Sequence, residues 1–271
     1  MLILLILAIV FNSNTAQGVR EGLGLCATVV IPSLFPLTVL ALFTFNSGAY
    51  TLLAKTVGLD FTVWLLSALG GYPCGAILLE RLYEMGVVDK KRAEKMLCFC
   101  VNAGPSFVVY TVGKTVLHNT FYGVLLLTVH LLPSFIFMLI IALKEKAQPY
   151  VYEQNFLISD AFVLSVRGGL EGSLSLTASI TFIFALTGML KGLLPQNIID
   201  KIVCFFEVTY GIKSNRNNLY LTAFLLGFSG VSVILQIMSV QTKIKPKISV
   251  VFISRFLHGL TSFLLSVIAF A

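Results

Sequence analysis

Arg255 and His258 are the polar side chains whose types and spacing most directly suggest chemistry. They are three positions apart in an apolar stretch, so a helix there projects both from one face. An arginine in such a stretch costs at least roughly 2.5 kcal/mol to insert and usually faces a protein interior or a watery cavity. Because the guanidinium fork suits a carboxylate, we expect an anionic solute to bind between Arg255 and the region of Asn102 and Ser106. The alternative is that Arg255 lies near an interface and extends to lipid headgroups.

Residues that interrupt helices supply the other candidate binding groups. Gly70, Gly71 and Pro73 interrupt one apolar stretch, and Gly104 with Pro105 interrupts a second. Such breaks expose backbone amides and carbonyls that a polar solute can bind, and they are tolerated in a membrane only where protein or a cavity surrounds them. The alternative for any one of them is close helix packing, which small residues also serve.

The second half of the chain has a similar interruption at Ser229, Gly230 and Ser232, with Gln236 four residues beyond. Interruptions at matching positions of the two halves favour a binding site over packing alone. The candidate substrate-binding residues are Ser33, Gly71, Tyr72, Pro73, Asn102, Gly104, Ser106, Thr177, Ser229, Ser232, Gln236, Arg255 and His258.

Patterns typical of enzymes and metal sites are missing from the sequence. It contains no H-E-x-x-H zinc motif, no G-x-S-x-G elbow and no Walker loop. The five cysteines lie in apolar stretches without a CxxC pair, and the three histidines lack a second ligand nearby. We therefore expect no enzyme, no metal ion and no cofactor. The nearest acids to the spans, Glu171 and Glu207, are expected at the membrane interfaces.

The composition excludes a water-soluble protein. Hydrophobic residues make up 57% of the 271 residues and charged residues only 11%, with a mean hydropathy of +0.94, whereas a soluble domain is about 25% charged. The net charge of +7 is spread over short loops rather than gathered on a basic face, so nucleic acid is not an expected partner. We expect one all-α, multi-pass domain, residues 1–271, in the lipid bilayer of a cell membrane.

Apolar runs separated by breakers define the elements that must position the candidate site. The stretch 22–45 is expected to form a re-entrant helical hairpin with Pro32 and Ser33 at its tip, the alternative being a kinked single span. Residues 162–194 repeat this pattern, with Thr177 near the second tip. Spans are expected at 61–79, 96–116, 120–143, 220–240 and 248–270, and an interfacial segment at 196–211.

The two halves resemble each other in order and in detail. LGGYPCG at Leu69 matches LGFSGVS at Leu226, and each leads into a basic loop. We expect repeat 1 at about 18–117 and repeat 2 at about 162–271, with a linking span at about 120–143. One extra span inverts the second repeat, an arrangement that places transporter sites near the bilayer midplane. It also places Lys243 on the face opposite the basic loop 80–95, against the positive-inside tendency.

Five runs together carry a resemblance to a known family: GLGLCATVVIPSLFPL, GGYPCGAILLERLYEMG, AEKMLCFCVNAGPSF, GFSGVSVILQ and ISRFLHGL. The chain resembles the sporulation integral membrane protein YlbJ family, which carries a nucleoside-recognition (Gate) domain and is distantly similar to concentrative nucleoside transporters. The resemblance covers nearly the whole chain. Its motifs fall on Gly71, Tyr72, Pro73, Gly75, Asn102, Gly104, Pro105, Ser106, Gln236, Arg255 and His258.

The resemblance implies movement of dipicolinic acid, a planar pyridine dicarboxylate, across a forespore membrane. We therefore expect a transporter of a small anionic solute that works by alternating access during sporulation. One alternative is a non-transporting scaffold or accessory protein of a sporulation complex, which needs no solute-sized pocket. A second is a nucleoside transporter. Besides lipid and solute, a homo-oligomer and other sporulation membrane proteins are the partners to consider.

Overall fold

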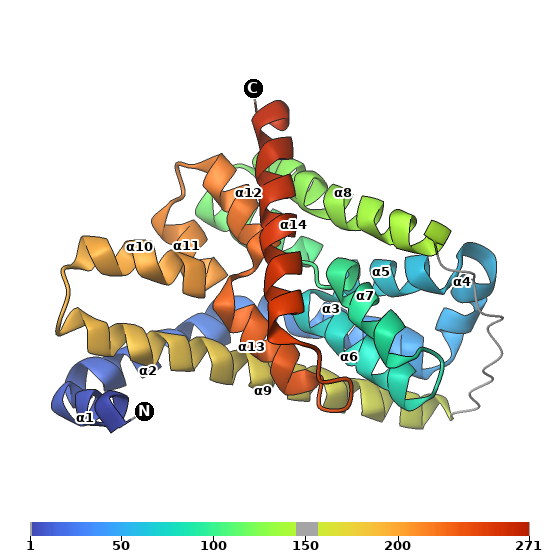
Figure 1. Cartoon of the computed structure of the whole chain (residues 1–271), viewed down its shortest axis with the longest axis horizontal. Coiled ribbons are helices and arrows are strands. Elements are labelled where there is room, and N and C mark those ends of the chain that lie inside the picture. The colour runs from blue at the N-terminus through green and yellow to red at the C-terminus, as the bar shows by residue number, and fades with distance from the viewer. Residues whose placement is uncertain (1, 145–156, 271) are drawn as a thin grey trace.

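The computed structural model describes residues 2–144 and 157–270, and these form helices joined by short connections (Figure 1). Five of the described helical stretches are long and apolar enough to cross a membrane: 12–46, 120–144, 158–191, 219–240 and 248–269. The expected all-α, multi-pass membrane fold is confirmed. The helices are α1 (Leu2–Val10), α2 (Asn12–Leu25), η1 (Cys26–Val30), α3 (Ile31–Asn46), α4 (Ala49–Val57), α5 (Leu59–Gly70), α6 (Tyr72–Glu84), α7 (Lys90–Cys100), η2 (Ser106–Val116), α8 (Thr120–Lys144), α9 (Ile158–Lys191), α10 (Gln196–Phe206), α11 (Val208–Ser214), α12 (Leu219–Phe228), α13 (Gly230–Val240) and α14 (Ile248–Ala269).

The first long stretch is a single helix, so the expected hairpin at 22–45 is wrong and the single-span alternative is correct. Helices α2 and α3 are joined through η1, a π-helical turn in which Ile31 N donates to Cys26 O, five residues back. This wider turn comes directly before Pro32, whose missing N–H then disturbs the helix less. Ser33 is not at a tip, because its hydroxyl donates to Val30 O of the same helix (2.9 Å).

Helix α9 is likewise unbroken, so the hairpin-like pattern at 162–194 does not form a hairpin. No proline lies between Ile158 and Lys191, and the Thr177 hydroxyl donates to Ser173 O one turn back (2.8 Å). The glycines of this region serve packing instead. A Cβ on Gly188 would collide with the Asn14 carbonyl, and one on Gly18 with the Phe184 carbonyl, so α9 runs antiparallel to α2 at close range.

The chain folds back at Gly71, whereas the sequence predicts a span at 61–79 that is interrupted there but continues across the membrane. Cys74 Sγ lies 3.6 Å from Leu66 O, although eight residues of straight helix cover about 12 Å. Gly71 has a φ of +84°, which suits glycine and turns the chain. Pro73 then stands in the first turn of α6, where no backbone donor is needed. We call α5 and α6 together hairpin 1.

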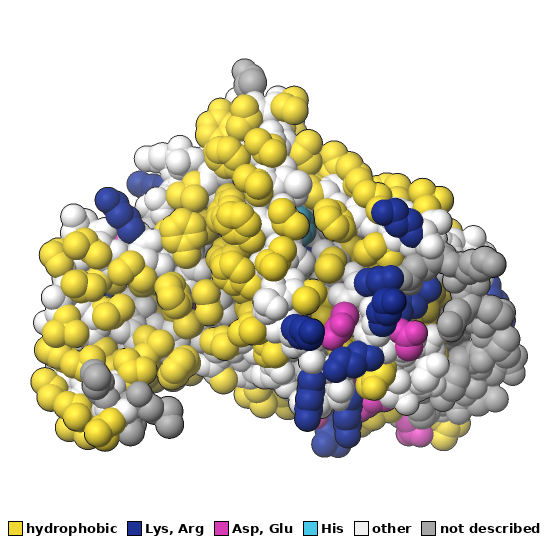
Figure 2. Space-filling view, viewed as in Figure 1, with side chains coloured by type: hydrophobic (Ala, Val, Ile, Leu, Met, Phe, Trp, Pro, Cys, Tyr) yellow, Lys and Arg dark blue, Asp and Glu magenta, His cyan; other side chains and the backbone are white. Residues whose placement is uncertain are grey.

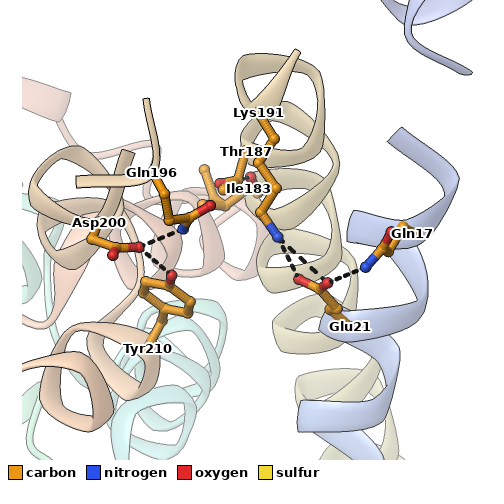
Figure 3. A network of polar contacts seen from close by, with 8 residues as sticks. All are labelled: Gln17, Glu21, Ile183, Thr187, Lys191, Gln196, Asp200 and Tyr210. Atoms are coloured by element: carbon orange, nitrogen blue, oxygen red, sulfur yellow. Dashed lines mark hydrogen bonds and ion pairs between the residues drawn. The ribbon is translucent and has the colours of Figure 1, made fainter. Parts of the chain in front are cut away.

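A second fold-back lies at Glu207, so the expected interfacial segment at 196–211 is a helical hairpin instead. Figure 3 shows the Tyr210 hydroxyl of α11 reaching the Asp200 carboxylate of α10, at 2.6 Å. A Cβ on Gly211 would lie 2.7 Å from Cys204 O, which confirms the close return of the chain. We call α10 and α11 together hairpin 2.

Two spans are interrupted where the sequence predicts. Helix α7 ends at Cys100 and η2 begins at Ser106, with irregular backbone around Gly104. Helices α12 and α13 are separated by Ser229, at a φ of +69°, followed by Gly230 at +79°. We call these break 1 (residues 101–105) and break 2 (residues 229–230). Each interrupted span is followed by an uninterrupted helix, α8 or α14, as Figure 1 shows.

The two basic loops lie on the same side, so the expectation that Lys243 lies opposite loop 80–95 is wrong. The Glu80 carboxylate at the end of α6 accepts bonds from Thr242 Oγ1 (3.1 Å) and Ile244 N (3.3 Å). Figure 2 shows Lys and Arg side chains gathered over this part of the molecule, beside broad hydrophobic surface. The physical reason is that α9 is one unbroken helix, long and apolar enough to cross a membrane, and such a crossing reverses the side of every later loop.

Candidate functional site

The two hairpin tips and the two breaks meet at one place inside the protein. At one side, a Cβ on Gly71 at the tip of hairpin 1 would lie 3.7 Å from Gly104 N of break 1. At the other, a Cβ on Gly230 of break 2 would lie 3.0 Å from Phe206 O and 3.3 Å from Val208 N, on either side of the tip of hairpin 2. We call this place the junction.

Tyr72 joins the two halves of the junction. It begins α6, is 3% exposed, and its hydroxyl donates to Leu226 O near the end of α12 (2.9 Å). Its ring also lies edge-on to His130 of α8, with centroids 6.5 Å apart. Hairpin 1 is therefore tied to the broken helix of the other half.

A cavity of about 20 Å³ lies at the junction, which is room for about one water molecule. It brings together three of the predicted site residues, Tyr72, Ser232 and Gln236. Its walls come from hairpins, broken helices and long helices alike. The lining residues are Val30, Leu34, Tyr72, Phe107, Leu176, Ile180, Glu207, Val208, Thr209, Ser232, Val233 and Gln236.

Glu207 is the acid of this cavity, whereas the sequence predicts it only as an acid at a membrane interface. It is fully buried at the tip of hairpin 2. One carboxylate oxygen, Oε2, accepts a bond from Tyr210 N (2.6 Å) and so caps α11, while Oε1 has no partner. A buried carboxylate oxygen without a partner is costly and points to an unmet binding capacity. The short apolar run before Glu207 gives no signal of its burial.

Ser232 and Gln236 are one turn apart on α13 and face the same cavity. The Ser232 hydroxyl is buried without a partner. Gln236 Nε2 lies 3.5 Å from Gly172 O of α9, at the limit of a hydrogen bond, so its amide is only loosely engaged. Both side chains therefore have hydrogen-bonding capacity available to a ligand.

Arg255 lies beside the junction and is fully buried, so it does not extend to lipid headgroups. Its Nη1 donates to Val101 O, and Nη2 donates to Cys98 O (2.8 Å). These carbonyls belong to the last turn of α7 and to break 1, where a helix end leaves acceptors unsatisfied. The guanidinium thus caps a helix, and Arg255 is not among the described residues that line the cavity.

His258 and His130 form a stacked pair next to Arg255, with ring centroids 4.7 Å apart. Ala103 N of break 1 donates to His130 Nε2 (2.8 Å), so that nitrogen carries no proton. His258 Nε2 lies 2.7 Å from His130 O, and Arg255 Nη1 lies 3.3 Å from His258 Nδ1. These contacts assign a proton to His258 Nε2 and an acceptor role to Nδ1. His130, alone in an apolar span, was missed by the sequence reasoning.

Most of the remaining predicted site residues lie at the junction, and two of them do not. Asn102 is fully buried in break 1, where Nδ2 donates to Phe99 O (2.8 Å) and Oδ1 has no partner. Ser229 forms break 2 and contacts Leu226 O through its hydroxyl (3.3 Å). Residues Gly71, Pro73, Gly104 and Ser106 shape the tip and break at the junction, whereas Ser33 and Thr177 bond to their own helices and are not among the residues lining the cavity.

Both amino ends and carboxyl ends of helices lie at the junction. Helices α6, η2, α11 and α13 begin there, and three of them have no side-chain cap, α11 being capped by Glu207. Among the helices that end there, α7 receives the cationic cap of Arg255. The uncapped amino ends provide backbone N–H donors and partial positive charge.

A curated relative is the sporulation integral membrane protein YlbJ of Bacillus subtilis (strain 168). The two are 23% identical over 303 aligned positions, which cover 90% of this chain and 74% of the relative. No family model and no solved structure matches the chain. The similarity confirms the resemblance indicated by the sequence motifs, and together with the five apolar helices it confirms a multi-pass integral membrane protein.

Proposed function

We propose that this chain, a homologue of the sporulation protein YlbJ over nine-tenths of its length, is a transporter that moves a small acidic solute by alternating access. The observation that carries the proposal is the junction. Two hairpins and two interrupted spans end around one buried cavity whose polar atoms, Glu207 Oε1 and Ser232 Oγ, have no partner. A protein that only needs packing gains nothing from buried polar groups left unsatisfied.

The order of elements supports an inverted repeat in a register different from the one the sequence motifs indicated. Each half has a long helix, a hairpin, an interrupted span and a returning helix, and α2 and α9 run antiparallel. In this register hairpin 1 is equivalent to hairpin 2, and α8 to α14. His130 and His258, the stacked pair, are then each the eleventh residue of equivalent helices. Transporters built in this way bind solute where the repeats meet.

The solute class follows from the charges around the junction. Uncapped amino ends of helices stabilise an acidic group, as anion sites in many proteins do. Apolar walls from Leu34, Phe107 and Leu176 suit an aromatic ring. A pyridine dicarboxylate such as dipicolinic acid, the solute that the family resemblance implies, has both features. A nucleoside has the ring but no acidic group, and we rank it second.

Alternating access requires the junction to open. A cavity of about 20 Å³ is too small for such a solute, so the described conformation is a closed one. Opening needs the hairpins to move away from the breaks, and the bond from Tyr72 to Leu226 O must then be broken. Hairpins that enter from opposite sides provide two separate openings, which is the requirement for alternating access.

Uptake into proteoliposomes tests the proposal, with labelled dipicolinate, uridine and an aliphatic dicarboxylate as parallel solutes. We expect dipicolinate uptake by the wild type, and at least a tenfold loss in Ser232→Ala. Ser239→Ala is the matched control, because Ser239 is on the same helix but exposed. No uptake of any solute by folded protein would contradict transport and favour the scaffold alternative.

A further inference from the structure

We propose that Glu207 binds the proton that crosses the membrane together with the acidic solute, so that the protein is a proton-coupled symporter. This inference rests on the proposed function and adds the coupling ion to it. Glu207 lies at the tip of hairpin 2, is fully buried, and lines the junction cavity. A buried ionisable side chain in a membrane protein is expensive and is normally kept for ion or proton movement.

The two oxygens of Glu207 have different surroundings. Oε2 accepts the bond from Tyr210 N (2.6 Å) at the amino end of α11, where partial positive charge stabilises one negative oxygen. Oε1 has no partner, and the cavity beside it has room for a water molecule. A proton delivered through that water can therefore bind at Oε1 without breaking the cap of the helix.

The groups that face Glu207 leave its charge uncompensated by a cation. From its own hairpin come Thr209 and Tyr210, from α13 come Ser232 and Gln236, and from α6 comes Tyr72. Cys26 of η1 and Tyr72 both interact electrostatically with Glu207. Tyr72 also interacts electrostatically with Arg255.

The guanidinium of Arg255 is already engaged by Val101 O and Cys98 O. Among the described residues, the ion pairs that involve Asp60, Glu171 and Glu21 lie elsewhere. The carboxylate of Glu207 thus has hydrogen-bond donors around it but no salt-bridge partner of its own in the described part of the chain.

An acidic solute in the same cavity makes the charged form of Glu207 untenable. Two like charges in one small buried site repel strongly, and one of them then takes up a proton. The step is a simple protonation: Glu207 carboxylate plus one H⁺ from the outside solution gives the neutral acid, and the solute carboxylate takes the place of its charge. After the junction opens to the other side, solute leaves and the O–H of Glu207 releases the proton there.

Proteoliposomes with a pH gradient and a clamped membrane potential test this coupling. One proton per solute predicts about tenfold accumulation of dipicolinate for a gradient of one pH unit. A pH-sensitive dye inside the vesicles should report proton entry when wild type and solute are mixed. We expect Glu207→Gln to exchange labelled for unlabelled dipicolinate without a gradient, because the amide can still cap α11, but to lose gradient-driven accumulation.

The control is Asp200→Asn, which removes a carboxylate from the same hairpin at a half-buried position that is not in the described lining of the cavity. It should accumulate dipicolinate like the wild type. Wild-type uptake without proton entry would overturn the coupling while leaving transport intact, and so would undiminished accumulation by Glu207→Gln. Failure of the wild type to move any solute overturns the proposed function instead, which separates the two proposals.

Discussion

The hydroxyl of Tyr72 donates to the carbonyl of Leu226 over 2.9 Å, across 154 positions of sequence. Tyr72 stands at the tip of hairpin 1, and Leu226 near the end of α12 in the other half of the chain. This bond joins the two halves at the junction, and its rupture accompanies opening in the proposed transport cycle.

Replacing Tyr72 with Phe should favour the open conformation. The substitution removes the shorter of two side-chain bonds to Leu226 O and leaves this buried carbonyl only the 3.3 Å contact with the Ser229 hydroxyl, which costs about 1–2 kcal/mol in the closed form. That free energy corresponds to roughly a fivefold to thirtyfold higher open population. The measurement is the rate at which a cysteine at position 232 reacts with a small maleimide. Tyr122→Phe, at the less buried start of α8, should leave the rate unchanged, and equal rates in both variants would contradict the role of Tyr72.

Substituting Gly75 should prevent hairpin 1 from closing. A Cβ there would collide with the carbonyl of Cys100 on α7, and backbone cannot yield cheaply. We expect Gly75→Ala to destabilise the protein by about 3 kcal/mol or more. Gly24→Ala is the matched control, because a Cβ on this helical glycine meets nothing within 4 Å and should be neutral or stabilise by about 0.5–1 kcal/mol. Thermal unfolding in detergent compares the two, and similar midpoints would contradict the packing of hairpin 1.

One substitution distinguishes whether Arg255 acts as a helix cap or as a direct ligand of the solute. As a cap it serves Val101 O and Cys98 O, and Arg255→Lys loses the planar fork that reaches both, at a cost of about 2 kcal/mol of stability. Dipicolinate affinity per folded molecule should then change less than threefold. Thermal unfolding and calorimetric binding on the same preparation give both numbers. A tenfold weaker affinity with unchanged stability would make Arg255 a solute ligand instead.

Much of the junction was predictable because its chemistry is local. Gly71, Gly104 and Ser229 interrupt helices for reasons that lie in their own residue types, and the structure has a tip or a break at each. What each interruption does could not be predicted. At Gly71 the chain reverses, whereas at Gly104 it continues, and the difference is set by which neighbours each segment packs against.

The errors have the same physical origin. Pro32 and Pro36 look like a hairpin tip, but a π-helical turn before Pro32 keeps the helix continuous. Glu207 and His130 look unremarkable in sequence because their importance depends on contacts with distant segments: Glu207 with the cavity and His130 with Ala103 of break 1. Burial of a single polar residue is a tertiary property, and hydropathy along the chain does not report it.

The side of the membrane on which each loop lies can be tested, and it depends on whether α9 crosses the membrane completely. Cysteines replacing Lys91 and Lys243 should react with an impermeant maleimide from the same face of the membrane, and one replacing Lys213 from the opposite face. All three lysines are exposed. The background should have the five native cysteines changed to alanine. The positive-inside tendency places the first two in the cytoplasm. Labelling of positions 91 and 243 from opposite faces would contradict the topology.

The most direct test of the account is whether solute protects the junction. A cysteine at position 232, in the same background, should react with a small permeant maleimide as the cavity opens. Saturating dipicolinate should slow this reaction at least tenfold, while a cysteine at position 239 on the exposed face of α13 should react at the same rate with or without it. Equal rates at position 232 with and without dipicolinate, uridine and the aliphatic dicarboxylate would contradict a solute site between the hairpin tips and the breaks.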